Sequence, residues 1–326
     1  MPGASIVSYA QNREDVVLWR ALGHLPHGRY VEVGANHPRT HSVSRAFYDH
    51  GWSGVTVEPV HEFAEMHRTE RPRDVLVEAA VVAVADEDVT LYTIPGTGLS
   101  TVRGDISEEH RSHGWDPEAG AVPTTTLRAI LEEHPEFATE THFLLVDTEG
   151  SERGVLESAD LRAWRPWVVV VEATAPLTNR PTHGEWEDLL TGAGYEFTLF
   201  DGISRFYVAE EHAPTLRGAL SYPACALDPF VDADQAELRA ALDAGARSVE
   251  QLERSRAVLL NDLVRWRSQA VTAWAAMVTD EWKPEEVTHL RNEVRSLHRE
   301  LAAMRETLSW RVTSPLRTVR RLGRTR

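Results

Sequence analysis

The stretch Tyr30-Val-Glu-Val-Gly-Ala-Asn36 decides the fold. Its β-prone residues predict a short buried strand, and Gly-Ala-Asn predicts a turn directly after it, because glycine adopts backbone conformations that other residues avoid. In open α/β sheets, ligands bind outside the carboxyl ends of the strands, near the point where the strand order reverses. We therefore expect part of this stretch to line a ligand site. The expected residues are Glu32, Gly34, Ala35 and Asn36.

Strand and helix patterns alternate along the chain after this stretch. Alternation of this kind indicates parallel βαβ units. The last two strands are joined by the short turn Asp201-Gly202 and predict an antiparallel pair at one edge. The sequence therefore predicts an α/β fold with a seven-stranded, mostly parallel sheet and an antiparallel edge strand. The further strands are expected at residues 55–59, 75–82, 143–150 (a strand with the loop after it), 167–172, 195–200 and 206–208.

Two segments lie between the expected strand at 75–82 and the one that begins at residue 143. Residues 89–94 alternate as a strand does and are expected to form a hairpin with residues 75–82. Residues 95–123 are polar and rich in turn-forming residues, which predicts a long connection with a functional role.

Composition excludes several classes of protein. The 326 residues carry a net charge of −16, which argues against a nucleic-acid partner. Cys225 is the single cysteine, so the chain has no internal disulfide or multi-cysteine zinc site. We find no signal-peptide pattern and no apolar run near the roughly 18 to 20 residues that a membrane span needs. These features predict a cytoplasmic protein.

The composition changes near Pro229, and three parts are expected: a domain at 1–230, a helical arm at 231–310 and a basic tail at 311–326. The arm carries apolar or small residues in alternating steps of three and four, a heptad seam in which Arg256 is the polar position before Pro284. The seam residues are Leu238, Leu242, Gly245, Val249, Leu252, Leu259, Leu263, Trp266, Ala270, Ala273 and Met277, then Val287, Leu290, Val294, Leu297, Leu301, Met304 and Leu308.

Such a seam fits either an antiparallel helical hairpin or an intermolecular coiled coil that makes a homodimer. The tail mixes six arginines with Trp310 and aliphatic residues, as basic segments on anionic membrane surfaces do. The phrase 309–317 also resembles tails of bacterial glycosyltransferases of surface-polysaccharide assembly. The tail therefore suggests peripheral contact with the inner face of a membrane, with a solvated C-terminus as the alternative.

Acidic residues follow several predicted strands, and their ends should converge on one rim. Glu58 ends the strand after Gly34 and is placed to accept hydrogen bonds from both ribose hydroxyls of a nucleoside. A dinucleotide site would need Gly-x-Gly-x-x-Gly, of which only Gly34 is present. This disfavours NAD and favours a nucleoside without a pyrophosphate, of which S-adenosylmethionine is the obvious one.

A series of short motifs runs along the chain: Ser8-Tyr-Ala-Gln11 with Glu14-Asp15, Tyr30-Val-Glu-Val-Gly-Ala-Asn-His-Pro38, Phe47-Tyr48, Gly51-Trp52, Val57-Glu-Pro59, Gly98-Leu-Ser-Thr101, Val122-Pro-Thr124 with Thr126-Leu127, Leu145-Val-Asp-Thr-Glu-Gly150, Arg165-Pro-Trp167, Val171-Glu-Ala173, and Phe200-Asp-Gly202 with Arg205-Phe-Tyr207. Taken together, these motifs resemble the FkbM family of S-adenosylmethionine-dependent methyltransferases over roughly residues 8–230. The resemblance implies the class I methyltransferase (Rossmann-like) fold and methylation of an oxygen, commonly on a sugar or polyketide hydroxyl. Thr148 departs mildly from the family pattern.

The resemblance also implies roles for single residues. Glu32, Gly34, Ala35 and Asn36 would form the cofactor loop, and Glu58 would hold the ribose. Ala80 and Val81 would flank the adenine. Asp147 would face the methionine moiety or the acceptor. Gln11 and Asp15 would close over the cofactor, and Ser100 and Thr101 would lie near the acceptor.

A sugar hydroxyl is a poor nucleophile, so a general base is expected to help. Glu149 is favoured because it follows the fourth strand, and Asp147, Glu172 and His37 are the other candidates. Asp147 and Glu149 could instead hold a divalent cation, although nothing in the sequence demands a metal. His37 and His41 are too few ligands to indicate zinc.

The sequence thus predicts an S-adenosylmethionine-dependent O-methyltransferase whose acceptor is a sugar hydroxyl of a surface glycan or glycosylated metabolite. An alternative is a non-catalytic methyltransferase-like scaffold that acts through its coiled coil. A third reading, an NAD-dependent nucleotide-sugar enzyme, is disfavoured by the missing glycines.

Overall fold

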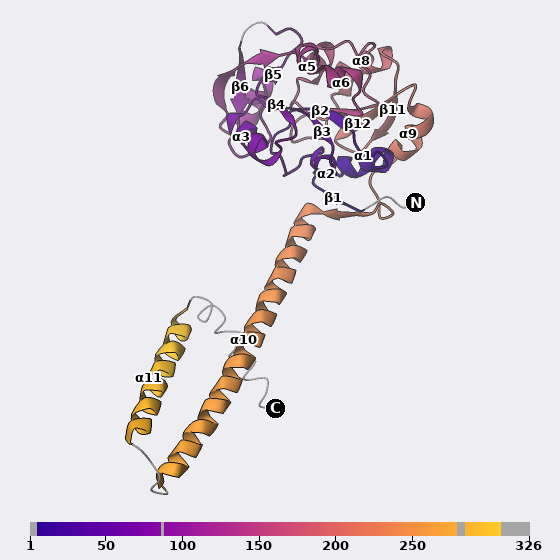
Figure 1. Ribbon diagram of the computed structural model, residues 1–326. Helices are drawn as coiled ribbons and strands as arrows, with labels where there is room; N and C mark the ends of the chain where they lie inside the picture. The colour runs from indigo at the N-terminus through magenta and orange to yellow at the C-terminus, as the bar shows by residue number, and fades with distance from the viewer. Residues whose placement is uncertain (1–4, 86–87, 279–283, 308–326) are drawn as a thin grey trace. The chain divides into compact units, whose positions relative to one another are not determined.

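The computed structural model describes residues 5–85, 88–278 and 284–307. The chain forms two compact units, Met1–Arg239 and Ala240–Arg326. The first unit is an α/β domain, and the described part of the second is helical (Figure 1). The expected basic tail at 311–326 lies outside the described residues.

A mixed sheet of seven strands forms the centre of the first unit. The α/β class and the seven strands are therefore confirmed. Four neighbouring pairs of strands are parallel and two are antiparallel. From one edge to the other, the strands are β11 (Tyr195–Phe200), β12 (Ser204–Ala209), β10 (Val168–Glu172), β9 (Phe143–Val146), β2 (Arg29–Val33), β3 (Ser53–Val57) and β4 (Val75–Val77).

The expected antiparallel pair lies at one edge of the sheet, but the predicted antiparallel edge strand is not the outermost one. β12 lies between β10 and β11 and is antiparallel to both, so β11 is the edge strand. The prediction was wrong because the turn at Asp201-Gly202 specifies a hairpin but not which of its two strands pairs with β10. Gly202 makes this turn with φ of +112°.

The strand order reverses beside β2. β2 pairs with β3, which follows it in the chain, and with β9, which lies more than 100 residues further on. Val33, the last residue of β2, is opposite both Val57 and Val146. The loops that follow these three strands therefore adjoin at one end of the sheet, which is where ligands bind in open α/β sheets.

Helices cover both faces of the sheet, as the period-2 alternation of its strands requires. Val31 and Val33 pack into one core cluster with residues of α5 to α8, whereas Tyr30 packs into the other with residues of α1, α2 and α9. The helices are α1 (Glu14–Leu22), α2 (Arg45–Asp49), α3 (His61–Glu70), α5 (Leu127–Glu133), α6 (Pro135–Thr139), α7 (Glu152–Glu157), α8 (Glu187–Gly192), α9 (Ala213–Leu220) and the short 3₁₀ helix η1 (His183–Glu185).

The segment between β4 and α5 departs from the predictions. The expected strand at 75–82 is divided, because β5 (Ala80–Val81) leaves the main sheet and pairs with β8 (Thr124–Thr125). β6 (Val89–Thr93) pairs with β7 (Glu118–Val122) rather than with residues 75–82. The connection at 95–123 also contains α4 (Gly104–Ser112). β7 was missed because its residues, Glu-Ala-Gly-Ala-Val, are largely exposed and lack apolar alternation.

The two ends of the first unit meet in a small parallel sheet. β1 (Ile6–Ser8) pairs with β13 (Phe230–Asp232), and Arg13 forms a salt bridge with Asp232. α10 begins at the next residue. The first unit therefore includes the residues just beyond 230.

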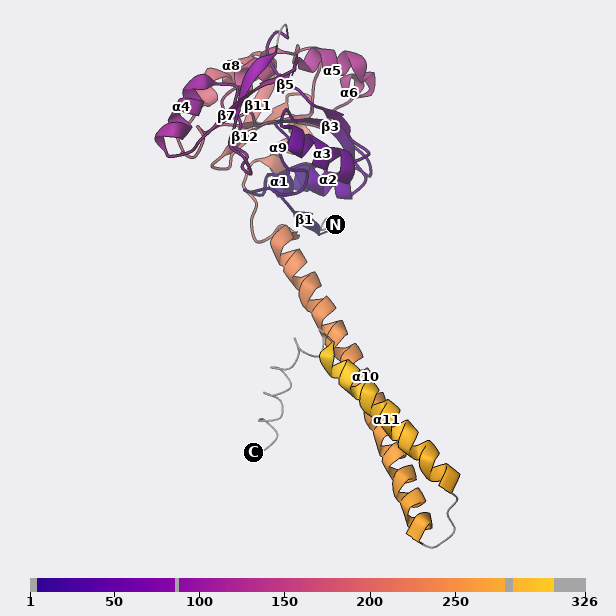
Figure 2. The same ribbon diagram turned by 90° about the vertical axis from the view of Figure 1, so that its left-hand side faces the viewer.

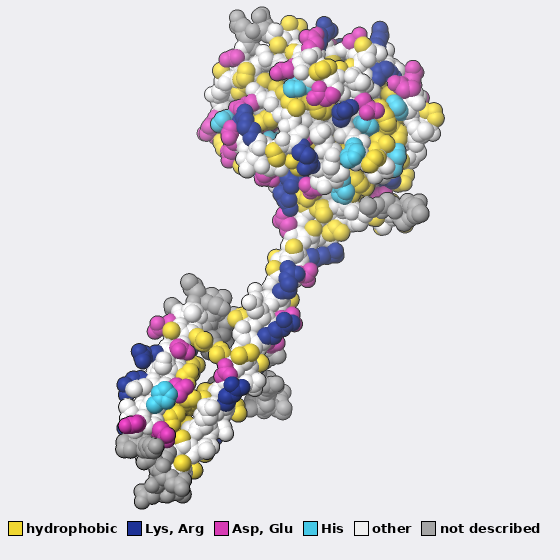
Figure 3. Space-filling view, in the orientation of Figure 1, with side chains coloured by type: hydrophobic (Ala, Val, Ile, Leu, Met, Phe, Trp, Pro, Cys, Tyr) yellow, Lys and Arg dark blue, Asp and Glu magenta, His cyan; other side chains and the backbone are white. Residues whose placement is uncertain are grey.

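The second unit contains most of α10 (Ala233–Val278) and all of α11 (Pro284–Glu306), which confirms the C-terminal helices. α11 runs back beside the C-terminal part of α10 (Figure 2), and residues of both helices line a groove there. Apolar side chains face this groove (Figure 3), among them Trp266, Leu290 and Val294. Among the described residues, no helix combines the length and apolar character that a membrane span requires.

Candidate functional site

A narrow pocket opens at the end of the sheet where the strand order reverses. It encloses about 660 Å³ of empty space, part of which is open solvent. Its lining comes from the loops after β2, β3 and β9, from β5, and from the segment around residue 100. The residues are Val33, Gly34, Asn36, Val57, Glu58, Pro59, Phe63, Ala79, Ala80, Val81, Leu91, Gly98, Ser100, Val102, Asp147, Thr148, Glu149 and Ser151.

Gly34 lies where the loop after β2 is in close contact with the residues that end β3 and follow β9. Its φ is +79°, and its N–H donates to the carbonyl of Val57 at 3.0 Å. A Cβ added there would lie 1.7 Å from the carbonyl oxygen of Asp147. The chain therefore needs glycine here both for the backbone conformation and for the close approach of its neighbour.

Glu58 holds the turn that follows Gly34. Its Oε2 accepts a hydrogen bond from the backbone N–H of Asn36 at 2.7 Å, and its Oε1 accepts one from Val60 N at 2.7 Å. Burial raises the pKa of this carboxyl to about 7, although both hydrogen bonds act to lower it. Each oxygen retains a second lone pair, so Glu58 could also accept hydrogen bonds from a ligand in the pocket.

An apolar wall faces this polar turn. Ala80 and Val81, the residues expected to flank an adenine, line the pocket together with Phe63 and Leu91. Sequence reasoning missed Phe63 and Leu91. Leu91 lies on the buried side of an alternating strand, a visible signal, but its position beside the pocket depends on the unexpected pairing of β6 with β7. Ser100, expected near the acceptor, also lines the pocket.

Other expected site residues lie outside the lining. Glu32 is buried and accepts a hydrogen bond from Ser44 Oγ, with the Arg71 guanidinium 3.8 Å away. Its side chain lies on the Tyr30 face of β2, because side chains alternate along a strand. Ala35 is buried and its N–H donates to the Val57 carbonyl at 3.1 Å.

The N-terminal and histidine candidates also have local partners. Asp15 is buried and accepts hydrogen bonds from Ser8 Oγ and Tyr9 N, both at 2.7 Å. Gln11 is exposed in a turn. The Nδ1 of His37 accepts hydrogen bonds from the N–H groups of Arg39 and Thr40, both at 3.0 Å. These bonds occupy that ring nitrogen in a turn of the loop.

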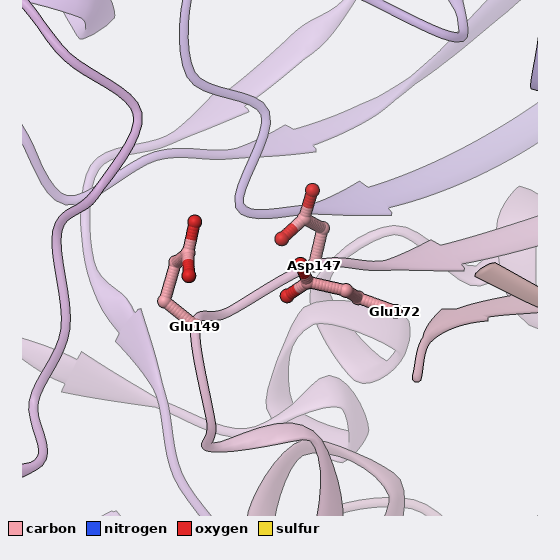
Figure 4. Close-up of side chains that lie close together, drawn as sticks. All are labelled: Asp147, Glu149 and Glu172. Atoms are coloured by element: carbon pink, nitrogen blue, oxygen red, sulfur yellow. The ribbon is translucent and has the colours of Figure 1, made fainter. Parts of the chain in front are cut away.

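Three carboxylates converge at the edge of the pocket, and we call them the carboxylate cluster: Asp147, Glu149 and Glu172 (Figure 4). One oxygen from each lies within 4.8 Å of the others. Asp147 and Glu149 follow β9, whereas Glu172 is the last residue of the neighbouring strand β10. Asp147 and Glu149 line the pocket, and Glu172 does not. The structure thus brings together three of the four proposed bases, without His37.

Burial and mutual repulsion raise the pKa values of the cluster. Burial raises the pKa of Asp147 to about 6, against a hydrogen bond with Glu172 that lowers it. The pKa values of Glu149 and Glu172 lie well above the ordinary value, first from burial and then from the charge of Asp147. No arginine or histidine among the described residues forms a salt bridge with the cluster.

The loop after β9, which carries Asp147 and Glu149, is fixed by hydrogen bonds to Glu152 and Thr101. Glu152 Oε1 accepts hydrogen bonds from Thr148 N at 3.2 Å and Gly150 N at 2.8 Å. Thr101, buried outside the pocket lining, donates from its Oγ1 to the Glu149 carbonyl at 2.9 Å. Sequence reasoning missed Glu152, although an acid in the first turn of a helix is a recognisable signal.

The amino-acid sequence matches one protein-family model. Residues 32–197, just over half of the chain, match the model described as the methyltransferase FkbM domain. The matched residues run from β2 into β11 and include every residue that lines the pocket. No protein of curated function matches the chain.

Proposed function

The chain belongs to the methyltransferase FkbM family, and on this premise we propose that it transfers a methyl group from S-adenosylmethionine to a hydroxyl group of a sugar-containing acceptor. The observation that carries the proposal is the pocket at the strand-order reversal, in which Gly34, Asn36 and Glu58 form a turn opposite an apolar wall. Family membership supports a methyltransferase, and the reversal beside β2 supports the class I methyltransferase fold.

The pocket residues fit a nucleoside that carries a cationic sulfur. Glu58 has lone pairs for ribose hydroxyls, and Ala80, Val81 and Phe63 offer apolar surface to a base. A single glycine turn without Gly-x-Gly-x-x-Gly leaves no pyrophosphate site of the dinucleotide kind. Ionised carboxylates of the cluster would provide negative potential on the side of the pocket where a sulfonium would be stabilised.

When bound, S-adenosylmethionine supplies a methyl group on a sulfonium, which leaves as a neutral thioether as the new C–O bond forms. The protein positions the acceptor oxygen in line with that methyl group, which accounts for much of the acceleration. The acceptor proton passes to a carboxylate. We propose Glu149 for this role, because its carboxyl lines the pocket and is not held there by a hydrogen bond to its buried Oε2.

Proton transfer to Glu149 requires that its carboxyl first be ionised. Its pKa is raised well above the ordinary value by burial and by the charge of Asp147. A positive charge in the pocket lowers such a pKa, because it stabilises the ionised form. The arrangement therefore supports a base that becomes active when a cation is bound beside it.

Calorimetric titration with S-adenosylmethionine, S-adenosylhomocysteine and NAD tests the proposal. We expect S-adenosylhomocysteine to bind with a dissociation constant in the micromolar range, about −8 kcal/mol, and NAD not to bind. Absence of binding of all three would overturn the proposal and support the non-catalytic scaffold.

We also propose that the second unit associates with a second copy of itself. Leu242, Val249, Leu252, Leu259 and Leu263 are seam residues of α10 and are between 44% and 64% exposed. Asp262 and Arg267 occupy a g position and the following e position of the heptad repeat. These positions face each other across a parallel coiled coil, so the opposite charges support a parallel pair of helices. Contact of the basic tail with a membrane remains a prediction on residues outside the described ones.

A further inference from the structure

We propose that Asp147, Glu149 and Glu172 bind one hard divalent cation of the Mg²⁺ and Mn²⁺ class at the edge of the pocket. The site itself follows from the geometry of these carboxylates. Its role in catalysis rests on the function proposed above.

The spacing of the carboxylates fits one ion. Their ligand oxygens lie within 4.8 Å of one another. Two oxygens that each lie 2.3–2.6 Å from a common Ca²⁺ are at most about 5 Å apart, and those around Mg²⁺ at most about 4.2 Å. The cluster is therefore compact enough to be drawn together around one ion, and Mg²⁺ would need its oxygens to move closer than Ca²⁺ would. An all-oxygen donor set selects Mg²⁺, Ca²⁺ or Mn²⁺ over softer metals.

A second observation points to a missing partner. The Oε2 atom of Glu149 is buried, yet it has no hydrogen-bond partner. A buried carboxylate oxygen without a partner is costly, and buried charges are paired or coordinate metals. The charges that act most strongly on Glu149 and Glu172 are carboxylates, from within the cluster or from Glu152. A cation is the group that would satisfy this oxygen and balance the charge.

The three side chains come from well-held positions. Asp147 N donates to the Val33 carbonyl at 3.0 Å, and Glu172 ends a strand that pairs on both sides, with β9 and β12. Thr101 and Glu152 hold the backbone around Glu149. A cation would thus bind to ligands whose backbone is already fixed, which favours affinity.

A bound cation would select the acceptor as well as activate it. Three carboxylate oxygens leave three positions of an octahedral shell for water or for substrate oxygens. Asp147 and Glu149 line the pocket, so an ion held by them would lie at its edge, within reach of an acceptor bound there. Two adjacent hydroxyls of a sugar would chelate the ion, and a metal-bound hydroxyl loses its proton more readily. With Oε2 of Glu149 on the ion, Oε1 of the same carboxylate would take that proton. The inferred acceptor class is therefore a vicinal diol.

Titration of the full chain with Mn²⁺, followed by electron paramagnetic resonance, tests the site. We expect one ion to bind more tightly than about 1 mM, the weak limit of protein calcium sites, and Mg²⁺ to displace it. Glu149→Gln and Glu172→Gln should each weaken Mn²⁺ binding by about tenfold to 100-fold or more. Glu133→Gln, an exposed acid on α5, is the matched control and should leave the affinity unchanged.

Binding of S-adenosylhomocysteine to the same proteins, with and without EDTA, separates this proposal from the proposed function and reports on folding. Normal binding in both glutamine variants, with Mn²⁺ affinity lost, supports the site. Two outcomes would overturn it while the methyltransferase proposal stands: no Mn²⁺ binding by a wild-type protein that binds S-adenosylhomocysteine, or equal Mn²⁺ binding by all variants. The latter would show an ion held only by the general negative charge of −16.

Discussion

The carbonyl oxygen of Asp147 lies 1.7 Å from the place where a Cβ at Gly34 would be. Residue 34 directly follows β2, and residue 147 directly follows β9 and belongs to the carboxylate cluster. The two halves of the pocket are thus in direct backbone contact, and a substitution at one alters the position of the other.

Gly34→Ala should therefore abolish binding of S-adenosylhomocysteine, because the loop after β2 or the loop after β9 must move. Gly51→Ala is the matched control, since Gly51 also has a positive φ, +90°, but an added Cβ meets nothing within 4 Å. Calorimetry should show normal binding for Gly51→Ala. Wild-type affinity in Gly34→Ala would contradict the assignment of the cofactor loop.

Glu58→Gln should weaken binding of S-adenosylhomocysteine by about tenfold to 100-fold, the worth of a hydrogen bond to a charged group. The amide oxygen can replace one carboxylate oxygen. The amide NH₂ takes the place of the other, and it cannot accept the hydrogen bond that a backbone N–H donates there. Glu62→Gln, an exposed acid in the first turn of α3, should not change the affinity. Equal affinities in the two variants would remove Glu58 from the site.

Stability should fall as pH rises from 6.5 to 8. The pKa of Glu14 is raised to about 8 and that of Glu58 to about 7, by burial first. Over this range the folded chain holds protons that the unfolded chain has lost, so rising pH favours unfolding. The pKa of His67, lowered by burial from 6.5 to about 4, affects stability mainly below this range.

Urea denaturation at the two pH values measures this difference. We expect Glu14→Gln to reduce the loss of stability by about 1 to 2 kcal/mol, since one pKa unit corresponds to about 1.4 kcal/mol. A midpoint that rises with pH in the wild type would contradict the predicted direction.

A domain truncated after Arg239 should fold and bind S-adenosylhomocysteine, whereas one truncated after Pro229 should be less stable. The shorter chain lacks β13, so β1 loses its partner and Arg13 loses Asp232. Thermal melting of both proteins checks this expectation. Equal melting temperatures would show that the β1–β13 pair contributes little.

Self-association through α10 should depend on its seam. Leu259→Asn places a polar group in the seam and should convert a dimer into a monomer in sedimentation experiments. Val264→Asn changes an apolar residue that is 66% exposed but lies off the seam, and should leave the dimer intact. A wild-type protein that sediments as a monomer would contradict the proposed association.

Much of the sheet could be predicted because its strands are short apolar runs between turn residues. Val168 to Val171, for example, is buried on both faces and reads as a strand without context. The order of β12 and β11 could not be predicted, because a hairpin turn does not specify the partner of either strand. β7 has no apolar pattern and pairs in the exposed β6–β7 ribbon.

Prediction of the site had a similar limit. Strand-end residues such as Gly34, Asn36 and Glu58 line the pocket, since parallel strands end at one edge of the sheet. Glu32 lies two residues before Gly34, and alternation directs it toward Arg71, whose position depends on the end of α3. The meeting of Glu172 with Asp147 depends on the register of two strands, which sequence spacing does not specify.

The pairing of β1 with β13 has a consequence for folding during synthesis. Ile6 cannot pair until Phe230 has left the ribosome, and β2 cannot gain its neighbour β9 until residues near 146 are made. At synthesis rates of about 5–20 residues per second, β2 waits for β9 on the order of 10 s. The nascent chain therefore carries an apolar strand with one open edge through much of its translation, and the domain closes only when the long helix begins to emerge.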